Sequence, residues 1–389
     1  MAKLGDVCNF YSGTGFPNAY QGDKHGKYPF YKVGDISKNV ISGNVELISC
    51  DNYINDDVVN LIKGIIIPPQ CVVFAKIGEA LKLNRRALTS CYCLVDNNVM
   101  GVQANNLYLD SRYFYYFMCN VDLQRYSEST AVPSVRKSRI AEIEIPLPSL
   151  EEQRHIAAIL DKVTDLIAQR RAQLDKLDLL VKSRFVEMFG DPVLNPLGWR
   201  TESLKDVCIK LTDGTHFSPD SFEAGDYKYI TAKNIKVSGF DFTNITYVSE
   251  EVHRPIYERC NPELGDVLYI KDGVTTGIAM VNTLDEEFSL LSSVALLKQD
   301  RQKINGYFLA ALLNNENMYT NIRRNMGGAA ITRLTIAKLN IIPIILPPIE
   351  LQNQFSFFVE KIEKSKLTIH KSLDKLEILK QAIMQRYFK

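Results

Sequence analysis

The sequence predicts an α+β protein built from two copies of one domain, each copy followed by a long helix. Three observations support this fold class. Similar segments return in the same order about 200 residues later. Short β-prone runs lie between Gly, Asn and Asp turns. Apolar residues also recur every seven positions along two stretches of about 40 residues.

The duplication covers the whole chain. The matched segments are LGDVC (4–8) with LKDVC (204–208), YPFYKVGDI (28–36) with YKYITAKNI (227–235), VVFAKIG (72–78) with VLYIKDG (267–273), and IPLPSLEEQ (145–153) with ILPPIELQ (345–352). Because their order and spacing agree, the repeat indicates a duplicated domain and not a solenoid unit.

The long helices are predicted over residues 150–189 and 349–388. Ser149 and Glu152 form a capping-box start for the first helix, and Gly190 with Pro192 supplies its stop. The heptad positions expected to face a partner helix are Leu160, Ile167, Leu174 and Val181 in the first helix, and Ile362, Ile369, Leu376 and Ile383 in the second. Helices of this length span about 60 Å, so we expect them to pack on each other.

Each repeat also contains a domain of mixed pattern before its helix. Strands are expected over 72–76, 90–95, 267–270 and 294–297, and shorter helices over 112–123 and 304–313. Prolines 146 and 148, and prolines 343, 347 and 348, then mark the change from domain to long helix.

Composition excludes several classes of protein. No apolar run approaches the ~20 residues of a membrane span, and the N-terminus has no apolar signal core. The eight cysteines are scattered without a CxxC pair, which argues against a zinc site and fits a reducing cytoplasm. The net charge of +1 requires any surface that binds nucleic acid to be local or completed by a partner.

Motifs for catalysis are weak. Neither Pro-Pro pair carries the Asn or Asp before it, or the aromatic after it, that an amino-methyltransferase needs. The stretch GDKHGK (22–27) is too short for a phosphate loop and lacks its Ser or Thr. Asp220 and Asp226 imitate a nuclease carboxylate pair, but a solvated loop is the favoured interpretation. An enzyme that acts on nucleic acid by itself is therefore a minor alternative.

The duplicated layout, with IPLPSLEEQ and ILPPIELQ leading into long helices, resembles the specificity subunit of type I restriction–modification enzymes. DGTH (213–216) followed by KYITAKNI also resembles the opening of a target-recognition domain in that family. The resemblance implies target-recognition domains at residues 1–148 and 191–345, each reading half of a bipartite double-stranded DNA site. It also implies that segments 149–190 and 346–389 form an antiparallel coiled coil as spacer.

By the same resemblance the chain is non-catalytic and assembles with two methyltransferase subunits and with restriction (motor and nuclease) subunits. S-adenosylmethionine is expected on the methyltransferase and no cofactor on this chain. The second junction departs from the family pattern because Leu351 replaces the Glu before Gln352, which is expected to weaken one capping contact. A coiled-coil scaffold without DNA readout remains the alternative.

Basic and polar residues supply candidates for DNA contact. Two of the basic regions, 131–139 and 327–333, lie at equivalent places before the proline junctions, and Lys76 corresponds to Lys271. A solvated face is the alternative for any single cluster, and His216 could equally make a turn hydrogen bond. The candidates are Lys76, Arg85, Arg86, Ser134, Arg136, Lys137, His216, Lys233, Asn234, Lys271, Arg324, Thr332 and Arg333.

Overall fold

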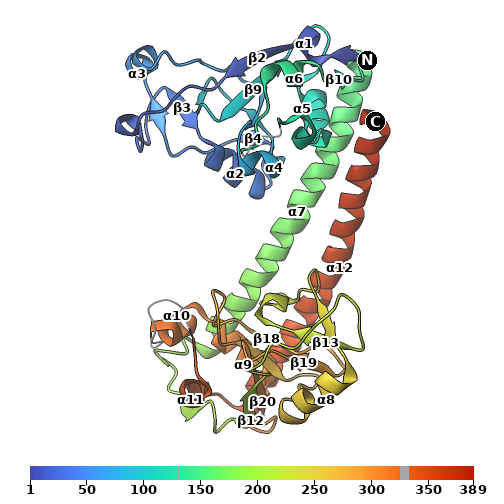
Figure 1. Cartoon of the computed structure of the whole chain (residues 1–389). Coiled ribbons are helices and arrows are strands. Elements are labelled where there is room, and N and C mark those ends of the chain that lie inside the picture. Colours follow the sequence, from blue (N-terminus) through green and yellow to red (C-terminus); the bar gives the residue numbers. More distant parts are fainter. Residues whose placement is uncertain (129–131, 325–332) are drawn as a thin grey trace. The chain divides into compact units, whose positions relative to one another are not determined.

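The computed structural model describes residues 1–128, 132–324 and 333–389 and divides them into two compact units. Unit 1 comprises Met1–Ala172 and His370–Lys389, and unit 2 comprises Gln173–Ile369. Both are α+β, as the sequence predicts (Figure 1). In the described part of the chain, no helix combines the length and apolar character needed to cross a membrane.

Unit 1 contains a five-stranded sheet in the order β2-β9-β6-β7-β4 and a three-stranded sheet in the order β5-β3-β8. Its strands are β1 (Ala2–Lys3), β2 (Cys8–Ser12), β3 (Tyr28–Tyr31), β4 (Glu46–Leu47), β5 (Tyr53–Ile54), β6 (Cys71–Ala75), β7 (Ala87–Thr89), β8 (Leu94–Val95), β9 (Val99–Ala104) and β10 (Glu144–Ile145). Its short helices are α1 (Leu4–Val7), α2 (Val33–Ile41), α3 (Asp56–Leu61), α4 (Glu79–Lys82), α5 (Ser111–Asn120) and α6 (Lys137–Ala141).

Unit 2 repeats this topology with a four-stranded sheet, β12-β20-β17-β18, and a three-stranded sheet, β16-β13-β19. Its strands are β11 (Arg200–Ser203), β12 (Cys208–Asp213), β13 (Tyr227–Ile230), β14 (Ile235–Lys236), β15 (Gly239–Phe240), β16 (Thr246–Val248), β17 (Val267–Ile270), β18 (Ala279–Val281), β19 (Phe288–Leu290), β20 (Val294–Gln299) and β21 (Pro343–Leu346). Its short helices are α8 (Glu250–Arg259), α9 (Gly306–Leu313), α10 (Glu316–Arg324) and α11 (Ile336–Asn340).

The three-stranded sheets show the equivalence clearly. Strand β3 pairs antiparallel with β5 and parallel with β8, and β13 pairs antiparallel with β16 and parallel with β19. In unit 2 the strand β12 carries one extra residue, because its register on β20 shifts between Cys208 and Lys210. A bulge places this extra residue, Ile209, outside the regular pairing. The β12–β20 pair of unit 2 therefore keeps the same pairing as the β2–β9 pair of unit 1, although the offset between the two sequences changes.

Some predicted bounds were wrong. The strand predicted over 90–95 is only Leu94–Val95, because the chain turns after Thr89 and exposes Cys91. The helix predicted over 112–123 ends at Asn120, since the next residue, Val121, is extended and only a separate 3₁₀ turn follows.

The long helices have the predicted bounds, with α7 at Leu150–Phe189 and α12 at Ile349–Phe388. The Ser149 hydroxyl accepts the Glu152 amide at 3.2 Å, and Gly190 leaves the helix with a φ of 75°. The C′ position favours glycine because this backbone conformation strains other residues.

In each unit the two helices run in opposite directions. The core of unit 1 joins Ile156 and Leu160, at the start of α7, to Phe388 at the end of α12. The core of unit 2 joins Phe185, at the end of α7, to Phe355 at the start of α12, with ring centroids 5.7 Å apart. The helix ends are thus part of each unit's core, although the sequence predicts only packing of helix on helix.

The predicted heptad positions lie on the covered side of the helices. Leu160 and Ile167 are buried, and the half-buried members are Leu174, Val181, Ile362, Ile369, Leu376 and Ile383. Ion pairs flank this row, between Arg171 and Glu377 at 2.8 Å in unit 1 and between Lys366 and Asp178 at 2.5 Å in unit 2.

A buried glutamine joins each domain to its long helix. In unit 1 the Gln153 amide group accepts from the Asp110 backbone and donates to the carbonyls of Tyr108 and Pro148. The Asp110 side chain also caps α5. Asp110 therefore contacts the first turns of both α5 and α7.

Gln352 makes the same set of bonds in unit 2, with the Asn305 backbone and the carbonyls of Lys303 and Pro347. At the second junction Leu351 packs on the core, and its amide donates to the Pro348 carbonyl at 3.0 Å.

Candidate nucleic-acid interface

In unit 1 the loop after β6 lies against the segment that leads into α6. Ile77 forms a β-bridge with Ser134, and the Val135 amide donates to the Lys76 carbonyl at 2.9 Å. Lys76 and Ser134 are half-buried, with backbones fixed by these contacts.

Unit 2 has the same arrangement at the loop after β17. Asp272 forms the bridge with Arg333, and the Leu334 amide donates to the Lys271 carbonyl at 2.8 Å. In unit 1 the structure therefore places Lys76 beside Ser134, and in unit 2 it places Lys271 beside Arg333. Each equivalent lysine thus lies next to the basic region of its own unit.

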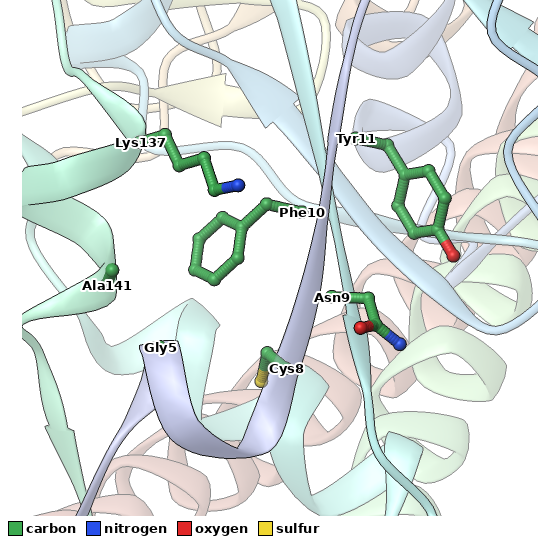
Figure 2. A pocket seen from close by; sticks show the side chains of 7 residues that line it. All are labelled: Gly5, Cys8, Asn9, Phe10, Tyr11, Lys137 and Ala141. Carbon is green, nitrogen blue, oxygen red and sulfur yellow. The ribbon is translucent and has the colours of Figure 1, made fainter.

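Arg136 and Lys137 are exposed at the start of α6. The Arg136 guanidinium contacts the Glu128 carboxylate at 2.9 Å. The Lys137 ammonium lies 5.5 Å from the centre of the Phe10 ring and lines an open pocket of about 470 Å³ between α1, β2 and α6 (Figure 2). These two cations remain accessible to an anionic partner.

Arg86 is a correction to the predicted contacts. Its side chain is 2 % exposed and donates to the carbonyls of Met118 and Val121 and to the Asn84 side chain. Burial disfavours the charged guanidinium and lowers its pKa to about 10. Arg86 therefore holds α5 against the sheet and cannot reach DNA, whereas the neighbouring Arg85 is half-buried.

Asn234 is a second correction. It is buried and accepts the Thr231 amide at 3.0 Å, so it closes the turn at the start of a 3₁₀ helix. Its counterpart in unit 1, Asp35, accepts the Lys32 amide at 2.8 Å in the same way. Asn234 therefore has a structural role, while the adjacent Lys233 is exposed.

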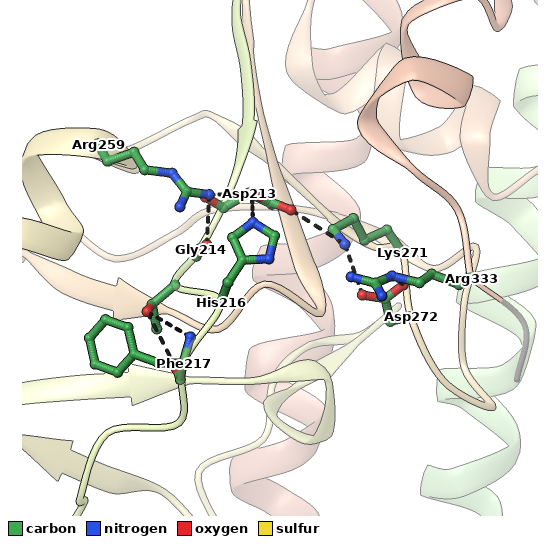
Figure 3. Close-up of polar contacts among 9 residues, drawn as sticks. Asp213, Gly214, His216, Phe217, Arg259, Lys271, Asp272 and Arg333 are labelled. Atoms are coloured by element: carbon green, nitrogen blue, oxygen red, sulfur yellow. Dashed lines mark hydrogen bonds and ion pairs between the residues drawn. The ribbon is translucent and has the colours of Figure 1, made fainter.

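The centre of the unit 2 site is the buried Asp213 carboxylate (Figure 3). It receives the Arg259 guanidinium, which also donates to the Gly214 carbonyl at 2.9 Å. The His216 ring contacts it at 3.1 Å and the Lys271 ammonium at 3.4 Å. One acidic side chain thus orients three basic ones.

Lys271 is the third correction, because it is 2 % exposed and lies between two carboxylates. Its ammonium contacts Asp272 at 2.8 Å, and Asp272 in turn contacts the Arg333 guanidinium at 3.4 Å. The buried lysine therefore positions Asp272, and Arg333, more than half exposed, is the basic group that faces solvent.

Two other candidates lie near this site in sequence. Arg324 is exposed at the end of α10. Thr332 lies outside the described residues.

Sequence reasoning missed two features of the site. One is Arg259, which comes from α8 and has no motif around it. The other is a repeated Gly-Thr-x-Phe, at residues 13–16 and 214–217. A Cβ on Gly13 would lie 1.7 Å from the Asp96 carbonyl oxygen, and one on Gly214 would lie 1.9 Å from that of Leu290. Only glycine lets the chain pass there, so the repeat could have been found by comparing the two halves.

Comparison with known proteins agrees with this geometry. The chain matches the type I restriction modification DNA specificity domain twice, over residues 1–177 and 196–380. The type I restriction enzyme MjaVIII specificity subunit of Methanocaldococcus jannaschii is 21% identical over 99% of this chain and 90% of its own length. The MjaIX specificity subunit of the same organism is 23% identical over 71% of this chain and 68% of its own length.

Solved structures share the fold. The crystal structure of the type I restriction–modification S subunit from M. genitalium superposes with a TM-score of 0.61 at 14% identity, covering 100% of this chain and 95% of that one. A chain from a study of complex assembly and conformational transition of the type I R-M system gives 0.54 at 19% identity, covering 100% and 97%. This chain therefore belongs to the type I restriction modification DNA specificity domain family, with one copy of the domain in each half.

Proposed function

We propose that each unit reads one half of a bipartite double-stranded DNA site. The family assigns the chain the part of a non-catalytic DNA specificity subunit, and the proposal concerns how the two units divide that task. The observation that carries it is one loop-and-bridge frame built twice with different side chains, Ile77 with Ser134 and Asp272 with Arg333. Two like frames suit two half-sites, and unlike side chains suit different bases.

The spacer in this proposal is an antiparallel coiled coil of α7 and α12. Support comes from the 40-residue length of each helix, from their opposite directions within each unit, and from the covered heptad row. Helices of ~60 Å are long enough for half-sites one DNA turn, ~34 Å, apart.

Two methyltransferase subunits are the proposed partners on these helices. Exposed apolar pairs lie at equivalent positions in the matching strings, Leu179 with Leu180 on α7 and Ile378 with Leu379 on α12. Two like patches suit two copies of one partner. The methyltransferases would bring S-adenosylmethionine, restriction subunits would complete the complex, and the assembly would work in the cytoplasm on the cell's DNA.

Reconstitution of the chain with its methyltransferase subunits tests the proposal. We expect a 1:2 complex that methylates a bipartite sequence and loses DNA affinity steeply as salt is added, because phosphate contacts release counterions. A coiled-coil scaffold would bind no DNA at any salt concentration. Methylation without sequence preference would contradict the division of reading between the units.

The spacer has its own test. One heptad inserted into both α7 and α12 should lengthen the preferred gap between half-sites and leave the bases of each half-site unchanged. Sequencing of the methylated DNA measures both. Altered bases with an unchanged gap would contradict the spacer.

A further inference from the structure

A loop of unit 2 presents one apolar side chain almost wholly to solvent. Val274 lies between β17 and β18 and is 92 % exposed, more than any other large apolar side chain in the described ranges. A single exposed valine is common on protein surfaces. The inference rests on two further features of Val274, the fixed backbone of its loop and the charged residues next to it.

The loop is held on both sides of Val274. The Arg323 guanidinium on α10 donates to the Thr276 carbonyl at 2.8 Å, and the buried Thr276 hydroxyl donates to the Gly273 carbonyl at 2.7 Å. A Cβ on Gly277 would lie 2.4 Å from the Tyr319 ring, so the chain passes directly over α10. The backbone that carries Val274 is therefore fixed before any partner arrives.

Val274, at the tip of this loop, is close in sequence to charged residues of the site. Asp272, two residues before Val274, holds the Arg333 guanidinium at 3.4 Å and the Lys271 ammonium at 2.8 Å. In the major groove an arginine can pair with guanine, and an apolar side chain can cover the methyl group of thymine. A β-branched side chain such as valine also loses little rotamer freedom on contact.

We propose that Val274 contacts the 5-methyl group of one thymine in the half-site read by unit 2. The inference rests on the proposed function and adds the base feature that this loop recognises. Unit 1 has no equivalent tip, because the short helix α4 begins at Glu79, directly after the corresponding Gly78. The contact therefore belongs to one half-site.

Uracil, which is thymine without the methyl group, tests this contact. Each thymine of the recognised sequence, on either strand, is replaced by uracil in turn, and kcat/KM for methylation by the reconstituted complex is measured. For the wild type we expect about a fourfold loss at one position of one half-site, the ratio that burial of one methyl group supplies. For Val274→Ala, which removes the two γ-methyl groups, we expect the ratio of the rates on thymine and uracil at that position to fall toward one.

Val237→Ala is the matched control, because this valine is 58 % exposed in the turn between β14 and β15 of the same unit. It should keep the wild-type ratio. Retained selectivity at the other positions shows that Val274→Ala is folded.

The inference is overturned if no uracil slows the wild type, if Val274→Ala keeps the ratio, or if Val237→Ala abolishes it. A wild-type complex with no sequence preference would instead overturn the proposed function.

Discussion

The two units place equivalent lysines on the same frame in opposite surroundings. Lys271 is buried between Asp213 and Asp272. Lys76 is half-buried, and within the described residues no carboxylate within ion-pair distance accompanies it. The residues that replace the two aspartates in unit 1, Ser12 and Ile77, carry no charge. One frame can thus hold a structural ion cluster or an accessible cation.

This difference between the two lysines should affect affinity for DNA. A lysine without a carboxylate attracts phosphate wherever DNA lies, and so adds affinity for any sequence. A guanidinium beside a carboxylate, as Arg333 is beside Asp272 at 3.4 Å, has less net charge to offer to phosphate. We infer that Lys76 adds more to the DNA affinity of unit 1 than the paired Lys271 adds to that of unit 2.

Replacing each lysine by alanine in turn should give the largest difference between the two units. Lys271→Ala leaves the buried Asp213 and the half-buried Asp272 without their ammonium and should destabilise unit 2 by about 3 kcal/mol. Lys76→Ala should leave unit 1 folded and reduce the slope of log affinity against log salt by about 1. Urea denaturation and DNA titration of each variant measure the two effects. Equal losses of stability would show that the surroundings of the lysines do not differ in energy.

The junction glutamines should show where the two units are alike. Gln153→Ala and Gln352→Ala each leave buried carbonyls and an amide unpaired, and each should cost its own unit about 2 kcal/mol. Gln169→Ala and Gln354→Ala, at exposed positions of the same helices, are the controls and should cost little. Urea denaturation measures both pairs, and a large difference between the two junctions would contradict their structural equivalence.

The sequence predicts the helices and domains better than it predicts the site. The long helices followed from local signals, the Ser149 cap and the sevenfold apolar spacing, and these signals do not depend on distant parts of the chain. Burial of Arg86 and Lys271 depends on which carbonyls and carboxylates the fold brings around them. Arg259 reaches Asp213 from 46 residues along the chain, and no spacing rule connects the two. Charge in a sequence therefore indicates a candidate, and only the fold decides whether it faces solvent.

The smallest expected effect concerns pH. His253 in α8 is fully buried, and its ring contacts Ser289 at 3.0 Å and Glu287 at 3.2 Å. At the matching place in α3, unit 1 has Val59, which cannot bind a proton. Burial lowers the pKa of His253 and nearby Arg254 adds to this, while the carboxylates of Glu287 and Glu250 oppose it.

Below the ordinary histidine pKa of 6.5, the unfolded chain therefore binds a proton that folded unit 2 still resists. Stability of unit 2 should fall as the pH drops through this range, because the unfolded state binds more protons. Between about pH 7.5 and about pH 5.5 we expect a fall in Tm that His253→Gln removes. His25→Gln, at an exposed histidine of unit 1, should keep the wild-type slope, which thermal unfolding at each pH would measure. If His253→Gln keeps that slope as well, acid sensitivity does not come from this ring, and the contrast between His253 and Val59 has no consequence for stability.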